Sequence, residues 1–315
     1  MCCLFLAASS TVAIAQTSVV DLVNPIIGTN GMGHTFPGAC VPFGLVQLSP
    51  DTDTIPHNVD GKYQPRSYEY CAGYQHKDSS IVGFSHTHFS GTGHSDLGDI
   101  LIMPTTGTLK LNPGTATNPD GGYRSRFSHG TEISRPGYYE VMLADYGVKA
   151  QLTTTQRVGI HKYTYPTNSE NQRIILDMIH GIYNYDGKVL WTNIRVENDT
   201  LVTGYRITNG WARTNYTYFA MSFSKPITHY GCEEKAKVNY RGGYAKFNMK
   251  ENFPDIGGRK IVAYFDFDPK TSDELEVKVA LSGVSTEGAL KNLRAEASGA
   301  DFDQLAAKAS DTWNK

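Results

Sequence analysis

The sequence predicts an all-β protein, an antiparallel sandwich of large sheets that is followed by two short helices. Between residues 100 and 281, more than a dozen short segments alternate apolar and polar residues, and no helical period separates them. The chain is also rich in aromatic residues, with 19 tyrosines, and contains 31 glycines in 315 residues, a composition that suits strands joined by tight turns. Both observations favour antiparallel pairing over a parallel α/β architecture.

The expected strands follow from period-two alternation bounded by turn residues. A loop rich in glycine and proline precedes the first of them. We expect 100–103 and 108–111 to form a hairpin, and the next three strands to form a meander. In chain order the expected strands are 43–48, 81–84, 100–103, 108–111, 137–143, 147–155, 158–165, 173–178, 189–197, 201–208, 216–223, 238–240, 244–249, 260–267 and 275–281.

The character of the sequence changes at residue 285. Residues 286–297 read as a helix, and Asp301 to Gln304 open a second helix with a capping box. One face of that second helix is apolar. Its stripe consists of Phe302, Leu305, Ala306, Ala309 and Trp313. We expect this stripe to need a partner, and to cause dimerisation or aggregation if it stays bare.

The first 15 residues are apolar and small, and Ala13-Ile14-Ala15 fits the rule for signal-peptide cleavage. They predict an exported protein, periplasmic or at the outer surface, and the run is too short for a membrane span. Without this segment three cysteines remain, so at most one disulfide can form. We expect Cys40, Cys71 and Cys232 to be inert, buried thiols.

Charge bounds the possible partners. The formal net charge is -2, 19% of residues are charged, and no cluster of lysine and arginine occurs. This composition is typical of a soluble globular protein and argues against a nucleic-acid surface.

The most informative stretch is 73–98, GYQHKDSSIVGFSHTHFSGTGHSDLG, which carries four of the ten histidines. They are His76, His86, His88 and His94. An apolar strand would deliver His86 and His88 to the rim of a sheet, on one face if the backbone stays extended. The glycines that follow allow sharp turns close to a ligand.

Three interpretations of these histidines remain open. In the first, they bind a metal ion together with Asp96 or Asp99. In the second, they satisfy buried backbone groups in a tight loop. In the third, neutral imidazoles, hydroxyls and loop amides line a polar sugar site.

Two other segments have a composition suited to binding. The loop tip 34–36 reads His-Thr-Phe, and residues 66–76 mix one guanidinium, one carboxylate and three phenols. We expect the segments 34–36, 66–76 and 86–96 to converge on one face of the sandwich, because a binding site needs several loops.

The residues VNPIIGTNGMGHTFPGACVPFGLVQLSPDT and YEYCAGYQHKDSSIVGFSHTHFSGTGHSDLGDILIMP closely resemble the N-terminal domain of glycoside hydrolase family 92. The resemblance covers the mature chain, and FSHTHFSGTG is a specific motif. It implies a galactose-mutarotase-like β-supersandwich over 19–284 and linker helices over 285–315. These helices would lead to an (α/α)6 catalytic domain that is absent from the sequence. In this family, that arrangement belongs to exported, calcium-dependent, inverting exo-α-mannosidases.

The resemblance also implies how the chemistry is divided. The catalytic carboxylates and most calcium ligands are expected in the helical domain, so no catalytic or metal-binding residue is assigned here, and this chain supplies one wall of a mannose pocket. An inverting mechanism needs an acid and a base, and Asp78, Asp96 and Asp99 sit in glycine-rich turns where aspartate usually caps backbone amides. The alternative is a free-standing periplasmic carbohydrate-binding protein. The residues expected to contact mannose-containing glycans are Arg66, Tyr74, His76, His86, His88, Ser90, Gly91, Thr92 and Asp96.

Overall fold

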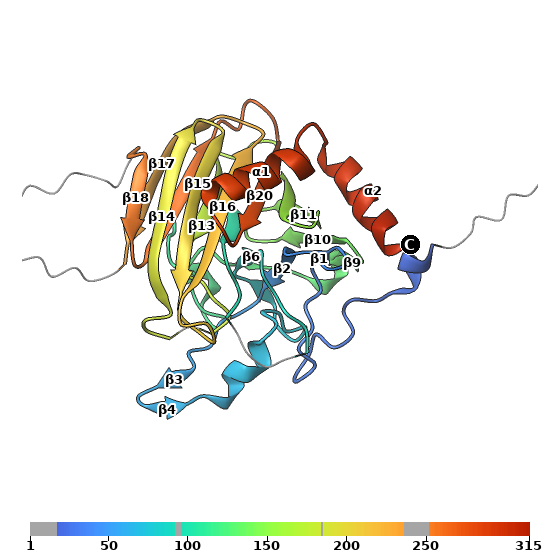
Figure 1. Ribbon diagram of the computed structural model, residues 1–315, viewed down its shortest axis with the longest axis vertical. Helices are drawn as coiled ribbons and strands as arrows, with labels where there is room; N and C mark the ends of the chain where they lie inside the picture. The colour runs from blue at the N-terminus through green and yellow to red at the C-terminus, as the bar shows by residue number, and fades with distance from the viewer. Residues whose placement is uncertain (1–17, 92–95, 184, 236–251) are drawn as a thin grey trace, which may run out of the picture.

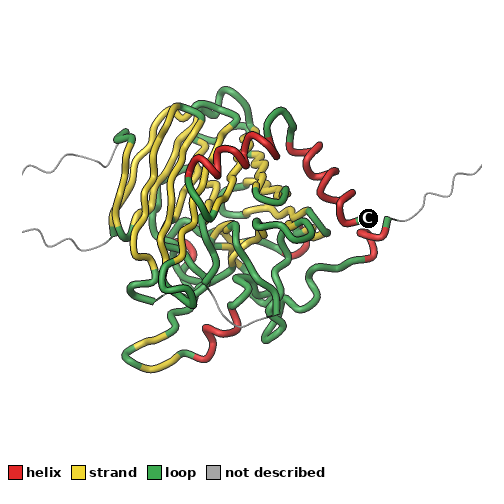
Figure 2. Tube along the Cα trace, in the orientation of Figure 1, coloured by secondary structure: helices red, strands yellow, loops and turns green. Residues whose placement is uncertain are grey.

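The computed structural model describes residues 18–91, 96–183, 185–235 and 252–315, and its strands pair into two large antiparallel sheets (Figure 1). The all-β prediction is therefore confirmed. Strands and loops fill the molecule, and the two α-helices lie together along one edge (Figure 2).

The smaller of the two main sheets has seven strands in the order β1-β2-β6-β7-β13-β19-β17. Its central strands are buried along their whole length, as strands covered on both faces must be. The strands are β1 (Ala39–Cys40), β2 (Gln47–Asp51), β6 (Gly83–Ser85), β7 (Leu101–Thr105), β13 (Gln172–Asp177), β17 (Ile227–Glu234) and β19 (Ile261–Phe267).

The larger sheet has nine strands in the order β18-β14-β15-β16-β20-β12-β11-β10-β9. It contains the expected meander, in which β10, β11 and β12 pair in sequence. The strands are β9 (Ile133–Arg135), β10 (Tyr138–Leu143), β11 (Val148–Thr154), β12 (Val158–Thr164), β14 (Val189–Asn198), β15 (Leu201–Thr208), β16 (Asn215–Phe223), β18 (Asp255–Gly258) and β20 (Glu274–Ser282).

Short elements decorate the sandwich. Two small two-stranded sheets pair β3 with β4 and β5 with β8. The strands are β3 (Asn58–Val59), β4 (Lys62–Tyr63), β5 (Ser80–Ile81) and β8 (Ser125–Arg126). The 3₁₀ turns are η1 (Val19–Leu22), η2 (Pro65–Tyr70), η3 (Pro119–Gly121) and η4 (His129–Thr131).

The main core lies between the two large sheets. Alternate residues of the nine-stranded sheet, such as Val141 and Phe219, are fully buried and belong to one cluster with Phe84 and Ile174 of the other sheet. Each such side chain contributes about 1.5–3 kcal/mol by leaving water. The period-two alternation of the sequence is thus explained by this shared core.

The two C-terminal helices are α1 (Thr286–Ala297), which has the expected bounds, and α2 (Phe302–Trp313), which begins as expected with a capping box formed by Asp301 and Gln304. They cover the outer face of the nine-stranded sheet. Phe302, Leu305 and Ala309 are at most 3% exposed, and the first two pack against side chains of β12 and β20. The expectation of a bare stripe was wrong, because this chain's own sheet supplies the partner.

Trp313 at the end of the stripe is 38% exposed, and its indole Nε1 donates to the carbonyl of Cys40 at 2.7 Å. This bond ties the end of α2 to β1. The helices are therefore part of the folded sandwich.

Some strand predictions were wrong. Residues 108–111 form no strand, and β7 pairs with β6 and β13 in place of a local hairpin. β17 was not predicted from the sequence, because it lies at the edge of the sheet and few of its residues are buried. The expected strands 238–240 and 244–249 lie outside the described residues, as does the expected signal peptide 1–15.

The three cysteines in the described part of the chain are free thiols. Cys71 is buried as expected, whereas the expectation of burial was wrong for Cys40 and Cys232, which are only partly buried. Burial raises the pKa of Cys40 and of Cys232 to about 11, and it also raises the pKa of Cys71. They stay protonated at neutral pH and are poor nucleophiles. Across the described ranges, no helix combines the length and apolar character needed to traverse a bilayer.

Replacing Phe302 with alanine should lower the free energy of unfolding by about 3–5 kcal/mol, because the ring is fully buried between α2 and the sheet. Urea denaturation followed by circular dichroism measures the change. Val284→Ala is the matched control, since Val284 is 83% exposed and should change stability by less than ~0.5 kcal/mol. Equal effects of the two substitutions would contradict the packing of α2.

Candidate functional site

The three segments expected to form a site do meet at one end of the sandwich. The amide of Gly91 donates to the carbonyl of His34 at 2.9 Å, and the His34 ring meets Tyr68 edge-on at 4.8 Å between centroids. The ring of Phe36 lies 5.5 Å from that of His88. The predicted convergence is confirmed for the described residues, and Thr92 and His94 lie outside them.

A buried carboxylate organises this end. Asp51 closes β2, and its two oxygens lie 2.9 Å from Nε2 of His88 and 2.7 Å from Nε2 of His180. All three side chains are at most 5% exposed. Although burial alone would raise it, the pKa of Asp51 is held below the usual carboxyl range by the charges and hydrogen bonds of the two imidazoles.

Gly73 shows how tightly the chain wraps this group. Its φ of +80° is in the left-handed region, and a Cβ there would lie 1.9 Å from Oδ1 of Asp51 and 3.1 Å from Nε2 of His88. Only glycine satisfies both conditions. The turn at Gly73 thus brings the segment 66–76 down onto the buried pair.

His86 belongs to a second buried chain of polar groups. Its Nδ1 lies 2.6 Å from the carbonyl of Ile100 and its Nε2 lies 3.0 Å from Nε2 of His161, whose Nδ1 meets the Tyr163 hydroxyl at 2.8 Å. Burial lowers the pKa of His86 to about 4 and that of His161 well below 6.5. Both rings are therefore neutral at physiological pH.

These positions bear on the expected site residues. His86 and His88 are at most 2% exposed, and their ring nitrogens bond to groups of this chain. One of the three interpretations, a metal site formed by His86 and His88 with Asp96 or Asp99, is not seen among the described residues. The structural interpretation of these two histidines, left open by the sequence, matches their geometry.

Asp99 is also internal. It accepts a hydrogen bond from the Thr87 hydroxyl at 2.9 Å and forms a buried ion pair with Arg206 at 3.0 Å. Lys188, 2% exposed, lies in the same region, and burial together with the Arg206 charge lowers its pKa to about 7. A network of buried charges thus lies beneath the loops.

Above this network an aromatic hollow opens to solvent. It has a volume of about 340 Å³ and is lined by His57, Tyr183, Tyr185, Gly210 and Trp211. The Trp211 ring is 72% exposed, and the rings of His57 and Tyr183 lie 5.3 Å apart. Exposed aromatic faces around a small hollow suit the apolar face of a pyranose ring.

Asp96 shapes the rim of this hollow. Its Oδ2 accepts hydrogen bonds from the amides of Trp211 at 2.6 Å and Ala212 at 3.3 Å. Gly210 permits the approach, since a Cβ there would lie 1.7 Å from Oδ1 of Asp96. The aromatic residues of the hollow were not predicted as site residues, although Gly210-Trp211 between two expected strands indicated an exposed aromatic turn.

The other expected residues are distributed as follows. Arg66, Ser90 and Gly91 are exposed at the loop end of the molecule. Tyr74 is 1% exposed and donates to Glu132 at 2.9 Å, so it points inward. A second hollow of about 340 Å³, between the helices and the turn 154–157, contains none of the expected residues.

No catalytic acid and base pair can be assigned from the three candidate aspartates. Asp78 accepts a hydrogen bond from the Tyr70 hydroxyl, Asp96 caps backbone amides, and Asp99 pairs with Arg206. Each group is committed to holding the loops together.

The calcium ion that the family resemblance implies prefers six to eight oxygen ligands. Among the described residues, one group of three potential metal ligands occurs, formed by the imidazoles of His76 and His129 and the carboxylate of Glu132. That set does not fit calcium.

Comparison with known proteins decides the family. Residues 22–282 match the glycosyl hydrolase family 92 N-terminal domain. The chain belongs to this family. Its fold is that of the family 92 N-terminal domain, as the resemblance of the sequence implied.

Solved structures agree. A family GH92 alpha-mannosidase from Bacteroides thetaiotaomicron, solved in complex with mannoimidazole, is 39% identical and superposes with a TM-score of 0.81, covering 94% of this chain and 36% of that one. A family GH92 inverting mannosidase from the same species is 26% identical with a TM-score of 0.71, covering 95% of this chain and 36% of that chain.

A curated relative from Arthroderma benhamiae, described as an uncharacterized secreted glycosidase, is 24% identical over 98% of this chain and 39% of its own length. This family 92 chain thus spans between 36% and 39% of the length of these relatives.

The neutral, buried histidines predict a pH dependence of stability. The folded pKa of His86 is about 4 and that of His161 is well below 6.5, whereas both titrate near 6.5 when unfolded. Protons therefore favour the unfolded chain, and stability present above pH 6.5 should fall as pH drops toward 4, by about 1.4 kcal/mol per pH unit for each ring.

Urea unfolding at several pH values measures this slope. His86→Asn keeps a donor for the Ile100 carbonyl but removes a titrating ring, and should flatten the slope. His229→Gln, at a partly exposed histidine, is the control and should leave it unchanged. An unaltered slope in His86→Asn would contradict the assignment of a neutral buried imidazole.

Proposed function

We propose that this chain is the N-terminal, sugar-facing part of an exported, inverting exo-α-mannosidase that releases mannose from glycans. The observation that carries the proposal is the family 92 match over residues 22–282, combined with 39% identity to an alpha-mannosidase solved with mannoimidazole. The loop cluster and the aromatic hollow at one end of the sandwich provide a surface suited to a sugar ring.

Within this proposal the residues divide into two groups. Arg66, Ser90, Gly91 and Asp96 lie at or near the surface of the loop end and are proposed, with Thr92, to line the sugar pocket. The others hold the loops from below. They are Tyr74, His76, His86 and His88.

Hydrolysis needs a second part of the protein. Inversion requires a carboxylic acid to protonate the leaving oxygen and a carboxylate to activate water on the opposite face of the sugar. The described aspartates considered above are engaged elsewhere, so we propose that both groups, and the ligands of a calcium ion, come from an (α/α)6 domain of the same protein. The N-terminal loop offers exposed apolar side chains for such a domain, Leu22, Ile27 and Met32.

The alternative of a free-standing carbohydrate-binding protein is less well supported. The chain matches one domain of larger glycosidases and covers 36–39% of their length. Export is supported by the apolar first 15 residues and by the description of the Arthroderma benhamiae relative as secreted.

The division of labour predicts that residues 16–315 alone do not release mannose. An α-mannoside should stay intact with calcium present, because loss of either catalytic carboxylate costs orders of magnitude in rate. Adding the helical domain in trans should restore release. Turnover by residues 16–315 alone, abolished by Asp96→Asn or Asp99→Asn, would place the chemistry in this domain instead.

The aromatic hollow predicts a binding role for Trp211. In a protein carrying both domains, Trp211→Ala should reduce kcat/KM for an α-mannoside about tenfold, equivalent to ~1.4 kcal/mol of lost stacking. Trp191→Ala is the matched control, since Trp191 is 42% exposed on β14 and does not line the hollow. Unchanged kcat/KM in Trp211→Ala would remove the hollow from the substrate path.

A further inference from the structure

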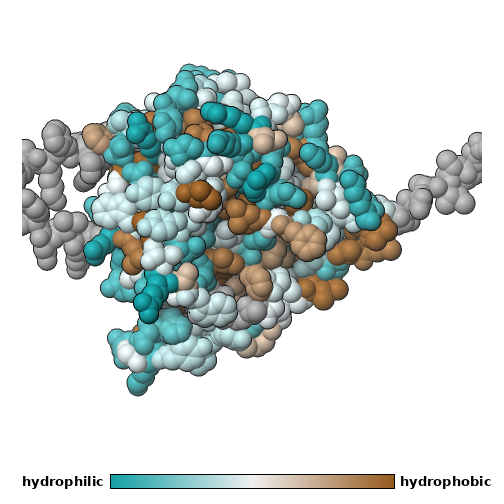
Figure 3. Space-filling model, in the orientation of Figure 1, coloured by the Kyte–Doolittle hydropathy of each residue, from teal (hydrophilic) through white to brown (hydrophobic). Residues whose placement is uncertain are grey.

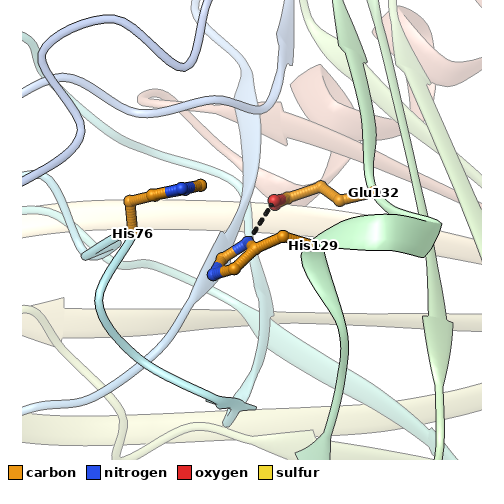
Figure 4. A group of neighbouring side chains, drawn as sticks. All are labelled: His76, His129 and Glu132. Carbon is orange, nitrogen blue, oxygen red and sulfur yellow. Dashed lines mark hydrogen bonds and ion pairs between the residues drawn. The ribbon is translucent and has the colours of Figure 1, made fainter.

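A cluster of metal-binding side chains lies beside the loop end of the sandwich, outside the aromatic hollow (Figure 4). His129 lies in η4, Glu132 ends that turn, and His76 reaches them from the loop that follows η2. One ligand atom from each residue lies within 4.8 Å of the others. The two ring centroids are 4.0 Å apart, and His129 Nδ1 lies 2.8 Å from Oε2 of Glu132.

Glu132 is held as metal-binding carboxylates usually are. Its side chain is 3% exposed, and it accepts hydrogen bonds from the hydroxyls of Tyr74 at 2.9 Å and Tyr139 at 2.6 Å. Such supporting hydrogen bonds orient a ligand before the ion arrives.

Within the described ranges, the ion-pair partner of Glu132 is His129, and no lysine or arginine pairs with it. His76 contributes an enclosed Nδ1 that has no hydrogen-bond partner in the part of the chain that the structure describes. A nearly buried carboxylate, an unpartnered imidazole nitrogen and a half-exposed imidazole form a site that is electrostatically suited to a cation.

We propose that His76, His129 and Glu132 bind a transition-metal dication, with Zn²⁺ as the best match. Two imidazoles and one carboxylate form a known zinc ligand set, in which solvent occupies the fourth position. The same nitrogen-rich set discriminates against Ca²⁺ and Mg²⁺, which prefer oxygen.

The geometry requires a small rearrangement. Bonds of 2.0–2.1 Å in a tetrahedron place ligand atoms about 3.4 Å apart, so the present spread of up to 4.8 Å must contract. The His129 side chain is 38% exposed and free on its solvent side to rotate toward the ion. Glu132, fixed by two phenols, supplies the immobile ligand.

The ion joins two parts of the chain that are distant in sequence. His76 ends the segment 66–76, which wraps the buried Asp51, while η4 leads into β9 at the edge of the nine-stranded sheet. A bound metal therefore fixes one wall of the loop cluster to the sheet. It should raise stability by mass action wherever free metal exceeds the dissociation constant.

The test uses untagged protein covering residues 16–315, stripped of metal and then titrated with ZnCl₂ by isothermal titration calorimetry. We expect one equivalent of Zn²⁺ to bind. With CoCl₂ in its place, we expect visible absorption bands typical of four-coordinate cobalt. His129→Gln and His76→Gln should each weaken Zn²⁺ binding by at least about 100-fold, and Tyr139→Phe by roughly 10-fold to 100-fold.

His229→Gln is the matched control, because His229 is 39% exposed and pairs with Asp266 without a third ligand. It should bind Zn²⁺ as the unaltered protein does. Circular dichroism verifies that each variant is folded, and His129→Gln is the decisive one because its side chain is at the surface. Binding below one equivalent, or unchanged affinity in folded His129→Gln, would overturn the proposal.

Discussion

The loop end of this protein depends on one buried carboxylate. Asp51 sits between His88 and His180, and the three come from chain segments that follow or end β2, β6 and β13 of the seven-stranded sheet. An isolated buried charge would be strongly unfavourable, so the two imidazoles are what make the position of Asp51 tolerable. Gly73 packs directly against Asp51, so the position of the segment 66–76 depends on this buried carboxylate.

This arrangement separates support from recognition. The histidines of the Ser85–His88 motif are the strongest candidates for catalysis in the sequence, but they support the loops from beneath. Their hydrogen bonds, and the lowered pKa of His86, suit a structural role. Recognition is left to the exposed rim and to the aromatic hollow at Trp211. Buried hydrogen bonds of this kind rigidify the chain segments that they join.

The C-terminal helices are held on the outer face of the nine-stranded sheet by a small number of contacts. Their apolar stripe packs on β12 and β20, and Trp313 bonds to the backbone of β1, so α1 and α2 leave the domain from a fixed position. Under the proposed function, this fixed connection would set the placement of a helical domain relative to the sandwich. That placement matters if both parts share one pocket.

The sequence by itself determined the β architecture, the meander, both helices, the capping box of the second helix, and the three loop segments that meet. Alternation and turn residues are local signals, and the specific motif around Ser85–His88 carried the family. It could not determine which side of each loop faces solvent. His86 and Trp211 show why: whether a side chain is enclosed depends on strands and turns far away in the chain, such as β12 beside His86.

Tertiary structure alone decided that β7 pairs with β6 and β13, that the helix stripe is covered by the chain's own sheet, and that His76 meets His129 and Glu132. Each of these contacts joins residues separated by tens to more than a hundred positions. Their formation depends on the summed burial and register of two sheets, which no local pattern in the sequence encodes.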